Sequence, residues 1–354
     1  MNLSPLEEIL KEEPAFRLKQ IKEAVFKNLI EDWNEAINLP TELREKLNQE
    51  APLKIDAKIF ESKDGAKKAL LNLKDGVKIE TVLMAHQDGR QTVCVSSQAG
   101  CALNCAFCAT GQLGFKRNLE ALEIIEQVLF FARRLKSESV ARVASLPRDC
   151  HASAAAEARN DDRVNNIVFM GMGEPFLNYD EVMEAIKILN DKEGLNIGSR
   201  HISISTSGII EGIEKLSDEP LQINLALSLH APNDTLRAKI MPIAKKYKIA
   251  EIFEALDGYI EKTKRRVMLE YIMIKDFNDS DVHAEELVSL IKKMRRPLVF
   301  VNLILYNPTG AFQPSDKKRV EMFKKILEKE KITVTQRWRF GENLGAACGQ
   351  LIAN

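Results

Sequence analysis

From residue 91 to residue 336 the sequence alternates between apolar runs of strand length and amphipathic stretches of helix length, which limits the possible folds more than any other feature. Strand–helix units of about 30 residues favour a parallel sheet with crossover helices. About six such units predict an α/β fold, a partly open (β/α)6 barrel whose functional residues follow the carboxyl ends of the strands. Strands are predicted at 92–95, 166–170, 201–206, 222–229, 267–274, 298–305 and 333–336, and helices at 119–135, 179–190, 250–262, 281–294 and 315–330.

The chain divides into four predicted regions. Residues 1–50 have apolar residues at helical spacing and predict a small, mainly helical accessory domain. Residues 51–90 alternate short β-type runs with turn sequences and predict a β-rich connecting region. The barrel is expected at 91–310, followed by a C-terminal extension at 311–354. Within the barrel, segment 137–163 is small and polar, and we expect it to be an exposed, mobile insertion.

Charge and cysteine content narrow the functional class. The 51 basic and 51 acidic residues give no net charge, which argues against a protein that coats nucleic acid by bulk charge but leaves local basic patches open. No apolar run approaches the length of a membrane span, and the first residues lack a basic-then-apolar signal pattern. Six cysteines, four of them between Cys94 and Cys108, are not typical of a disulfide framework. We therefore expect a cytoplasmic protein.

Three cysteines, Cys101, Cys105 and Cys108, follow the first predicted barrel strand at a C-x3-C-x2-C spacing. Thiolates this close together can hold one inorganic cluster, and the aromatic Phe107 would help to shield it from water. A closed four-iron cluster or a structural zinc site uses four protein ligands. Three cysteines therefore predict an iron–sulfur cluster with one iron open to a non-protein ligand. The alternatives are a zinc site completed by a distant residue, or three unliganded thiols.

A second motif, the run GMGEP at residues 171–175, directly follows the predicted strand at 166–170. Glycines let the backbone approach a ligand closely, and the carboxylate of Glu174 can accept hydrogen bonds from an ammonium group. Alone, such a turn is weak evidence for a ligand site. After the three-cysteine loop, at the end of the next barrel strand, it predicts a loop that binds the amino group of a small molecule.

These motifs and several others together resemble the RlmN/Cfr family of radical S-adenosylmethionine (SAM) RNA-adenine methyltransferases, over nearly the whole chain. In radical SAM enzymes a three-cysteine loop holds a [4Fe-4S] cluster whose open iron binds SAM. The resemblance implies a TIM-like radical SAM barrel and an RNA-binding role for the accessory domain. The matching runs are CVSSQAGC (94–101), FMGMGEP (169–175), SISTSG (203–208), LSLHAP (227–232), KIMPI (239–243), LYNP (305–308) and AACGQL (346–351).

The resemblance also implies which residues bind each cofactor. The [4Fe-4S] cluster would be held by Cys101, Cys105 and Cys108. Two SAM molecules would be used per turnover, one as the methyl donor and one as the radical source. The residues that would hold SAM are Gly173, Glu174, Ser205, Ser228, Leu229 through its backbone, His230 and Asn307.

By the same resemblance, two further cysteines carry the methyl transfer. A simple polar displacement cannot methylate the electron-poor carbons 2 and 8 of adenine. A first SAM would instead methylate Cys348, and a radical from a second SAM would take a hydrogen from this methyl group, so that its carbon adds to adenine. Cys94 would then attack Cys348, releasing methylated RNA and leaving a Cys94–Cys348 disulfide. Glu80 matches the family residue proposed as proton acceptor.

We therefore predict methylation of the 2-position of an adenosine in 23S rRNA, at the peptidyl transferase centre, and of the adenosine beside the anticodon in tRNA. The enzyme would be a monomer that receives electrons from a flavodoxin or ferredoxin. The alternatives are a Cfr-like enzyme that methylates the 8-position and gives antibiotic resistance, a radical SAM activase acting on protein, and an RNA-binding protein with a structural cluster. Phe340-Gly341 is closer to Cfr, whereas Pro175 is typical of RlmN.

Local basic residues are the candidates for contacts to RNA phosphates, because the net charge of the chain is zero. The candidates are Arg17, Lys19, Lys22 and Lys27 on the predicted N-terminal helices, and Lys116 and Arg117 after the cysteine loop.

Overall fold

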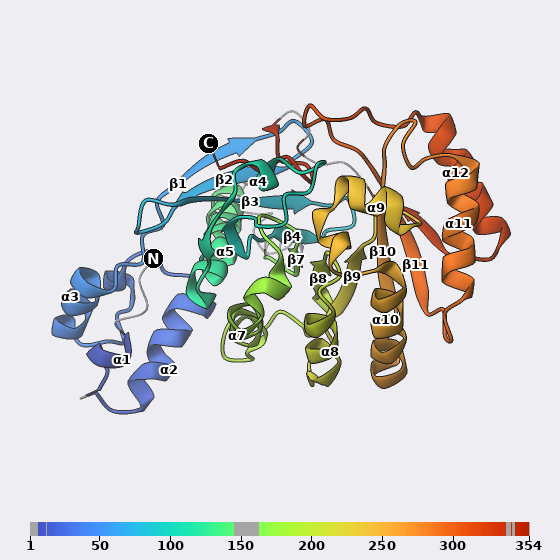
Figure 1. Ribbon diagram of the computed structural model, residues 1–354. Coiled ribbons are helices and arrows are strands. Elements are labelled where there is room, and N and C mark those ends of the chain that lie inside the picture. The colour runs from blue at the N-terminus through green and yellow to red at the C-terminus, as the bar shows by residue number, and fades with distance from the viewer. Residues whose placement is uncertain (1–5, 12, 145–162, 338–340, 342–343, 354) are drawn as a thin grey trace.

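The computed structural model describes residues 6–11, 13–144, 163–337, 341 and 344–353. Its centre is a ten-stranded sheet (Figure 1). The strands, in spatial order, are β1 (Ala57–Glu61), β2 (Lys67–Asn72), β3 (Lys78–Ala85), β4 (Gln91–Cys94), β7 (Asn166–Phe169), β8 (Ile202–Thr206), β9 (Asn224–Ser228), β10 (Val267–Met273), β11 (Val299–Leu305) and β12 (Val334–Gln336). A separate two-stranded sheet pairs β5 (Gln98–Gly100) with β6 (Phe115–Asn118).

Neighbouring strands from β4 to β12 run parallel, and those from β1 to β4 run antiparallel. Within the described residues the order begins at β1 and ends at β12, so the sheet curves without closing (Figure 1). The prediction of a partly open α/β barrel is therefore confirmed. Every residue of β4 and β7 except Asn166 is buried, as expected for parallel strands that are covered on both faces.

Helices cover the outer face of the parallel strands (Figure 1). The predicted long helices are present, and three short ones, α4, α8 and α9, were not predicted. Each has fewer than ten residues, which is too short for a clear helical period in the sequence. The helices of the barrel are α4 (Ala109–Gln112), α5 (Ala121–Ala144), α7 (Tyr179–Asn190), α8 (Ile210–Asp218), α9 (Asp234–Ile240), α10 (Ile249–Thr263), α11 (Asp281–Lys292) and α12 (Lys317–Lys329), with 3-10 turns η4 (Pro175–Asn178), η5 (Ser199–His201) and η6 (Pro242–Lys245).

Helix α5 continues to Ala144, beyond its predicted end at Leu135. The Glu138 side chain pairs with Lys67 of β2 (2.6 Å) and with Arg134 one turn earlier (2.7 Å), and both contacts favour continuation of the helix. Residues 137–144, which were expected to begin an exposed, mobile insertion, therefore continue helix α5. The rest of that predicted insertion, except Arg163, lies outside the described residues.

The N-terminal region is helical, as predicted, and lies on one side of the molecule next to α5 (Figure 1). Trp33 is fully buried, and its indole N–H donates to the Ala51 carbonyl (2.7 Å). Ile21 and Leu47 belong to the same continuous apolar core as the barrel strands. Removing this region would expose that core. Its elements are α1 (Leu6–Ile9), α2 (Phe16–Lys22), a π-helical turn η1 (Glu23–Lys27), a 3-10 turn η2 (Trp33–Glu35) and α3 (Thr41–Glu50).

Strands β1 to β3 extend the barrel sheet, because β3 pairs directly with β4. The predicted turns between them are present. In each, an aspartate side chain accepts a hydrogen bond from the N–H two residues on, as Asp64 does from Ala66 (3.1 Å) and Asp75 from Val77 (3.1 Å). The glycines of these turns have positive φ angles, +84° at Gly65 and +79° at Gly76.

No helix in the described part of the chain is long and apolar enough to cross a membrane.

Candidate active site

The carboxyl ends of the parallel strands, the cysteine loop and the C-terminal segment together surround a cavity. All the predicted site residues line it, with the exceptions of Glu80 and Leu229. Parallel strands bring these ends to one edge of the sheet, so residues far apart in the sequence meet there.

The three-cysteine loop lies between β5 and β6, and α4 begins directly after Cys108. The Cys108 N–H donates to the Cys105 carbonyl (3.0 Å), which closes a tight turn. The Ala106 N–H donates to the Ile240 carbonyl at the end of α9 (2.9 Å) and ties the loop to the barrel. The Cys101 N–H donates to the Gly114 carbonyl across the β5–β6 pair (3.1 Å). These bonds hold the three thiols on one side of the cavity.

The donor set of the loop fits an iron–sulfur cluster. Burial raises the pKa of the Cys101 thiol to about 11 and that of Cys105 well above its ordinary value, so both thiols stay protonated until a bound cation stabilises their thiolate forms. Within the described residues, no group of three or more His, Cys, Asp or Glu is arranged to ligate a single metal ion. A cluster does not require this arrangement, because each thiolate binds its own iron atom.

Glu174 is buried at the end of the loop that follows β7. Its carboxylate accepts hydrogen bonds from the N–H groups of Phe176 (3.2 Å) and Ser207 (2.7 Å), and burial raises its pKa. A bound ammonium group would favour the ionised form. At Gly173, φ is +99° and a Cβ would lie 2.5 Å from the Cβ of Gln98. Close packing against Gln98 therefore requires glycine at position 173. The sequence analysis had explained this glycine only by the approach of a ligand.

Ser205 and Ser228 meet on the carboxylate of Glu270, on β10. Ser205 Oγ donates to Glu270 Oε2 (2.6 Å), and Ser228 Oγ lies 3.3 Å from the same oxygen. The other Glu270 oxygen pairs with Arg337 Nη1 (3.2 Å). The sequence analysis missed Glu270 and Arg337. A glutamate inside the otherwise apolar strand Val267–Met273 was the available signal, since a buried charge needs a partner or a ligand.

His230 lines the cavity in a left-handed backbone conformation, with φ +59°. Its Nδ1 accepts a hydrogen bond from the Ile272 N–H (3.2 Å), and burial lowers its pKa to about 3. The neutral ring therefore carries its proton on Nε2 and has one donor to offer. The Phe107 ring packs edge-on against it, with ring centroids 4.9 Å apart.

Arg237, on α9, is fully buried and was also missed by the sequence analysis. Its guanidinium donates to the backbone carbonyls of Leu229 (3.1 Å), Ser207 (2.7 Å) and Ser228 (3.2 Å). These three bonds fix the loops that follow β8 and β9. The Leu229 carbonyl thus faces an arginine, and Leu229 does not line the cavity where a backbone contact to SAM was predicted.

Asn307 connects the predicted SAM site to the C-terminal segment. Its Nδ2 donates to the Cys348 carbonyl (3.0 Å). Its Oδ1 is buried and has no hydrogen-bond partner in the described part of the chain. A buried acceptor without a donor is costly, so this oxygen fits a ligand that brings an N–H or O–H group.

The segment that carries Cys348 is held by the helix after the cysteine loop. The Gly349 carbonyl accepts from the Ala109 N–H (2.7 Å), and the Leu351 carbonyl accepts from the Thr110 hydroxyl (2.7 Å). Gly349 has φ +82°, a conformation that favours glycine. Cys348 is therefore placed beside the cluster loop although the two are far apart in the sequence.

Cys94, at the end of β4, lines the cavity together with Cys348. Burial and the neighbouring Cys348 raise the pKa of the Cys94 thiol to about 12. Both cysteines are free thiols in this structure. The disulfide that the resemblance implies is thus not formed here, and remains a prediction for a step of turnover.

Glu80 is buried on β3 but does not line the cavity. Its Oε1 pairs with Lys68 Nζ (2.8 Å), and its Oε2 accepts from the Ile352 N–H (2.8 Å). The carboxylate therefore contacts the C-terminal segment a few residues after Cys348.

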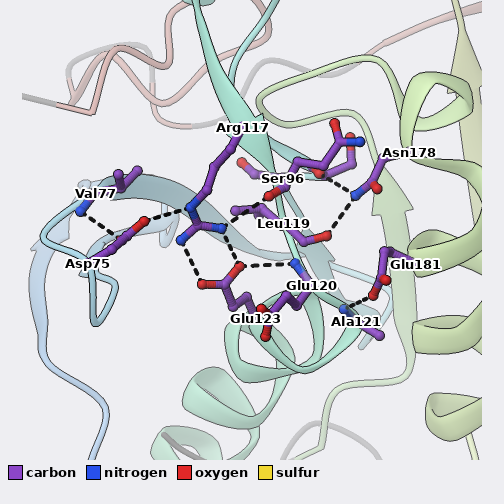
Figure 2. A network of polar contacts seen from close by, with 12 residues as sticks. Asp75, Val77, Ser96, Arg117, Leu119, Glu120, Ala121, Glu123, Asn178 and Glu181 are labelled. Atoms are coloured by element: carbon purple, nitrogen blue, oxygen red, sulfur yellow. Dashed lines mark hydrogen bonds and ion pairs between the residues drawn. The ribbon is translucent and has the colours of Figure 1, made fainter. Parts of the chain in front are cut away.

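Arg117, one of the predicted RNA contacts, is engaged within the protein (Figure 2). Its Nε donates to Asp75 (2.6 Å), and its two terminal nitrogens form a bidentate pair with Glu123 (2.7 and 2.8 Å). These hydrogen bonds raise the pKa of the Arg117 guanidinium. Arg117 thus ties β6 to the β2–β3 turn and to the start of α5, which supports the cysteine loop.

Comparison with known proteins defines the class first. Residues 151–288 match the family model described as the Radical SAM superfamily. A solved structure of a radical SAM methyltransferase from Sphaerobacter thermophilus matches with a TM-score of 0.87 and 41% identity, covering 100% of this chain and 98% of its own. The fold is therefore that of a radical SAM protein.

Curated relatives then define the family. The "Probable dual-specificity RNA methyltransferase RlmN" of Dictyoglomus thermophilum is 44% identical, over 96% of this chain and 91% of its own length. The protein of the same name from Bacillus pumilus is 41% identical, over 99% of this chain and 92% of its own length. This chain belongs to the RlmN family of radical SAM methyltransferases.

Proposed function

We propose that this protein methylates RNA at carbon 2 of adenosine, in 23S rRNA and, beside the anticodon, in tRNA. One observation carries the proposal: two thiols, Cys94 and Cys348, share a cavity with the three cysteines of the cluster loop. A thiol that carries the methyl carbon and a second thiol that releases it are what methylation of an electron-poor carbon requires. The names of the curated relatives, dual-specificity RNA methyltransferases, support RNA as the substrate.

In this proposal the cavity residues divide into a cluster set and a SAM set. The three cysteines of the loop hold a [4Fe-4S] cluster, which when bound supplies the electron that cleaves SAM. Glu174 accepts hydrogen bonds from the SAM amino group, and the unpaired Asn307 Oδ1 accepts another ligand donor. Ser205, Ser228 and His230 Nε2–H complete the polar lining. Two SAM molecules are used per turnover.

The two thiols then act in sequence. Cys348 takes a methyl group on sulfur, later loses one hydrogen atom from it, and the carbon bonds to C2 of adenine. Restoring the aromatic ring removes the C2 proton, which Glu80 would accept, and one electron, which the oxidised cluster would take back. The Cys94 thiolate attacks the Cys348 sulfur, so that an S–S bond forms and the S–C bond breaks. The released carbon takes a proton and becomes the methyl group, and an external dithiol reduces the disulfide.

The alternatives are less well supported. The curated relatives compared above carry the RlmN name, which favours the 2-position over the Cfr-like 8-position. Phe340, the Cfr-like residue, lies outside the described residues. A protein activase has no need of a second thiol such as Cys94. An RNA-binding protein with a structural cluster has no need of the buried Glu174 loop.

The other parts of the proposal are a monomeric enzyme, a cytoplasmic location and electron delivery by a flavodoxin or ferredoxin. Mass spectrometry of 23S rRNA and tRNA tests the whole proposal. RNA from cells that lack the gene should lose 2-methyladenosine, and the wild-type gene, but not its Cys348→Ala variant, should restore it. Restoration of 8-methyladenosine instead would establish the Cfr-like alternative.

For Glu80 we propose the role of proton acceptor. We expect Glu80→Gln to retain the cluster and Cys348 methylation, and to slow RNA product formation by roughly 10²–10⁴-fold, the usual contribution of a general base. Single-turnover assays with pre-methylated enzyme measure this step. Lys68→Met is the matched control, because it removes the ion pair with Glu80 and keeps the carboxylate. Equal losses in both variants would mean that Glu80 only anchors the segment after Cys348.

For RNA binding we propose the N-terminal Lys22 and Lys27. Of the other predicted contacts there, Arg17 bonds to Gln20 (2.7 Å) and Lys19 pairs with Glu193 (2.9 Å). Lys22→Glu with Lys27→Glu should weaken RNA binding and reduce the slope of log affinity against log salt by about 2, one per lost phosphate contact. Methylation of Cys348 by SAM should be unchanged.

The control for this pair is Lys317→Glu with Lys318→Glu, on exposed positions of α12 at the other side of the molecule (Figure 1). Filter binding at several salt concentrations measures both pairs. The same loss in both pairs would show that binding depends on total charge and not on the N-terminal helices.

A further inference from the structure

We propose that Arg337 is a positioning residue that supplies the positive charge beside Cys94 when this thiol attacks Cys348. The inference rests on the proposed function and adds a residue to which the family resemblance assigns no role. It explains how a buried thiol can act as a nucleophile in a cavity that is otherwise rich in negative groups.

The backbone delivers Arg337 into the cavity and two contacts hold its side chain. Arg337 directly follows β12, which pairs with β11, and its backbone N–H donates to the Leu303 carbonyl (2.9 Å). The guanidinium Nη1 lies 3.2 Å from Glu270 Oε1 and 3.2 Å from the sulfur of Met170. The Arg337 side chain is only 21% exposed. An arginine fixed at both ends has little freedom to leave the site.

Arg337 is the only lysine or arginine among the described residues that line the cavity. The other ionisable groups of the lining are the carboxyls of Glu174 and Glu270 and five thiols. His230 is neutral, since burial lowers its pKa to about 3. The positive charge in the described cavity lining, which acts on both Cys94 and Cys348, therefore comes from one side chain.

Three charged or titratable groups act on Cys94. Cys348 and Glu270 oppose ionisation of its thiol, and Arg337 favours it. The strand neighbours contribute no charge, because Cys94 pairs with Val82 on β3 and Val168 on β7. The Met170 backbone adds a hydrogen bond that also lowers the pKa of Cys94. Only a thiolate attacks a sulfur efficiently, so loss of Arg337 should impair this attack in particular.

The test measures release of RNA from the covalent adduct as a function of pH. Cluster-loaded enzyme, pre-methylated at Cys348, reacts anaerobically with an rRNA fragment. In Arg337→Gln the pKa of Cys94 rises, so the rising limb of the release rate should move up by about 1–2 pH units. Below that limb, release should slow roughly 10–100-fold and adduct should accumulate. Arg337→Lys should recover most of the shift, and Arg90→Gln, an exposed arginine paired with Asp88, should match wild type.

A second measurement needs no turnover: the pH dependence of Cys94 alkylation by iodoacetamide should shift in the same direction in Arg337→Gln. A wild-type midpoint in this assay overturns the inference, even where the variant fails to load its cluster. Weaker RNA binding with an unchanged pH profile also overturns it, and would mark Arg337 as a phosphate contact. Failure of the proposed function gives a different result, since Cys94→Ala would then trap no adduct at any pH.

Discussion

Cys94→Ala is expected to purify with RNA covalently attached through Cys348, and Cys348→Ala is expected to form no adduct. The reason is the placement of the two thiols in one cavity, where Cys348 carries the methyl carbon and Cys94 is the group that can break the resulting S–C bond. Without Cys94 the reaction should stop after the carbon has bonded to adenine. The Asn307 amide and the helix after the cysteine loop hold Cys348 in place during this step.

A denaturing gel before and after nuclease treatment measures the adduct, and mass spectrometry of the digested protein locates it. In Cys94→Ala, multiple-turnover methylation should fall below detection while the cluster content stays at the wild-type level. Cys150→Ala, at the one cysteine of the sequence that belongs to none of the motifs above, is the control for loss of a thiol and should behave as wild type. A Cys94→Ala protein with no nuclease-sensitive species would show that the thiol pair has another role.

Cys105→Ala is expected to abolish SAM cleavage, because one of the three thiols that would hold the cluster is lost. Cys105 is the most deeply buried of the three, and its turn with Cys108 shapes the loop. A cluster with two protein ligands should be incomplete or absent after anaerobic reconstitution. Reductive formation of 5′-deoxyadenosine should then fall below detection, and with it methylation of both Cys348 and RNA.

Iron and sulfide content, the electron paramagnetic resonance signal of the reduced cluster and chromatographic detection of 5′-deoxyadenosine measure these effects. Circular dichroism checks that the variant is folded, which we expect because Arg117 and the Ile240 carbonyl hold the loop without help from the thiols. Cys150→Ala again serves as the matched control. Wild-type iron content and SAM cleavage in Cys105→Ala would refute the three-cysteine assignment.

Much of the barrel could be predicted, since its signals are local. The long helices α7 and α11 and the strands β8, β10 and β11 lie within a few residues of their predicted bounds. Apolar runs and helical spacing report burial of one element at a time. The short helices α8 and α9 were missed because they are too short to show a clear helical period. The length of α5 was underestimated because its last turns depend on a contact between Glu138 and Lys67 of β2.

The sequence by itself determined the class of the site. The three-cysteine spacing, the GMGEP run and the cysteine of AACGQL carry their chemistry in residue type and order, which can be read without a fold. Only the tertiary structure decided which charges the site contains. It pairs Arg117 with Asp75 and Glu123, and it brings Arg337 to Glu270 and the two thiols. The physical reason is that a buried charge is stabilised by partners from other strands, and those partners are chosen by packing at long sequence separation rather than by any local pattern.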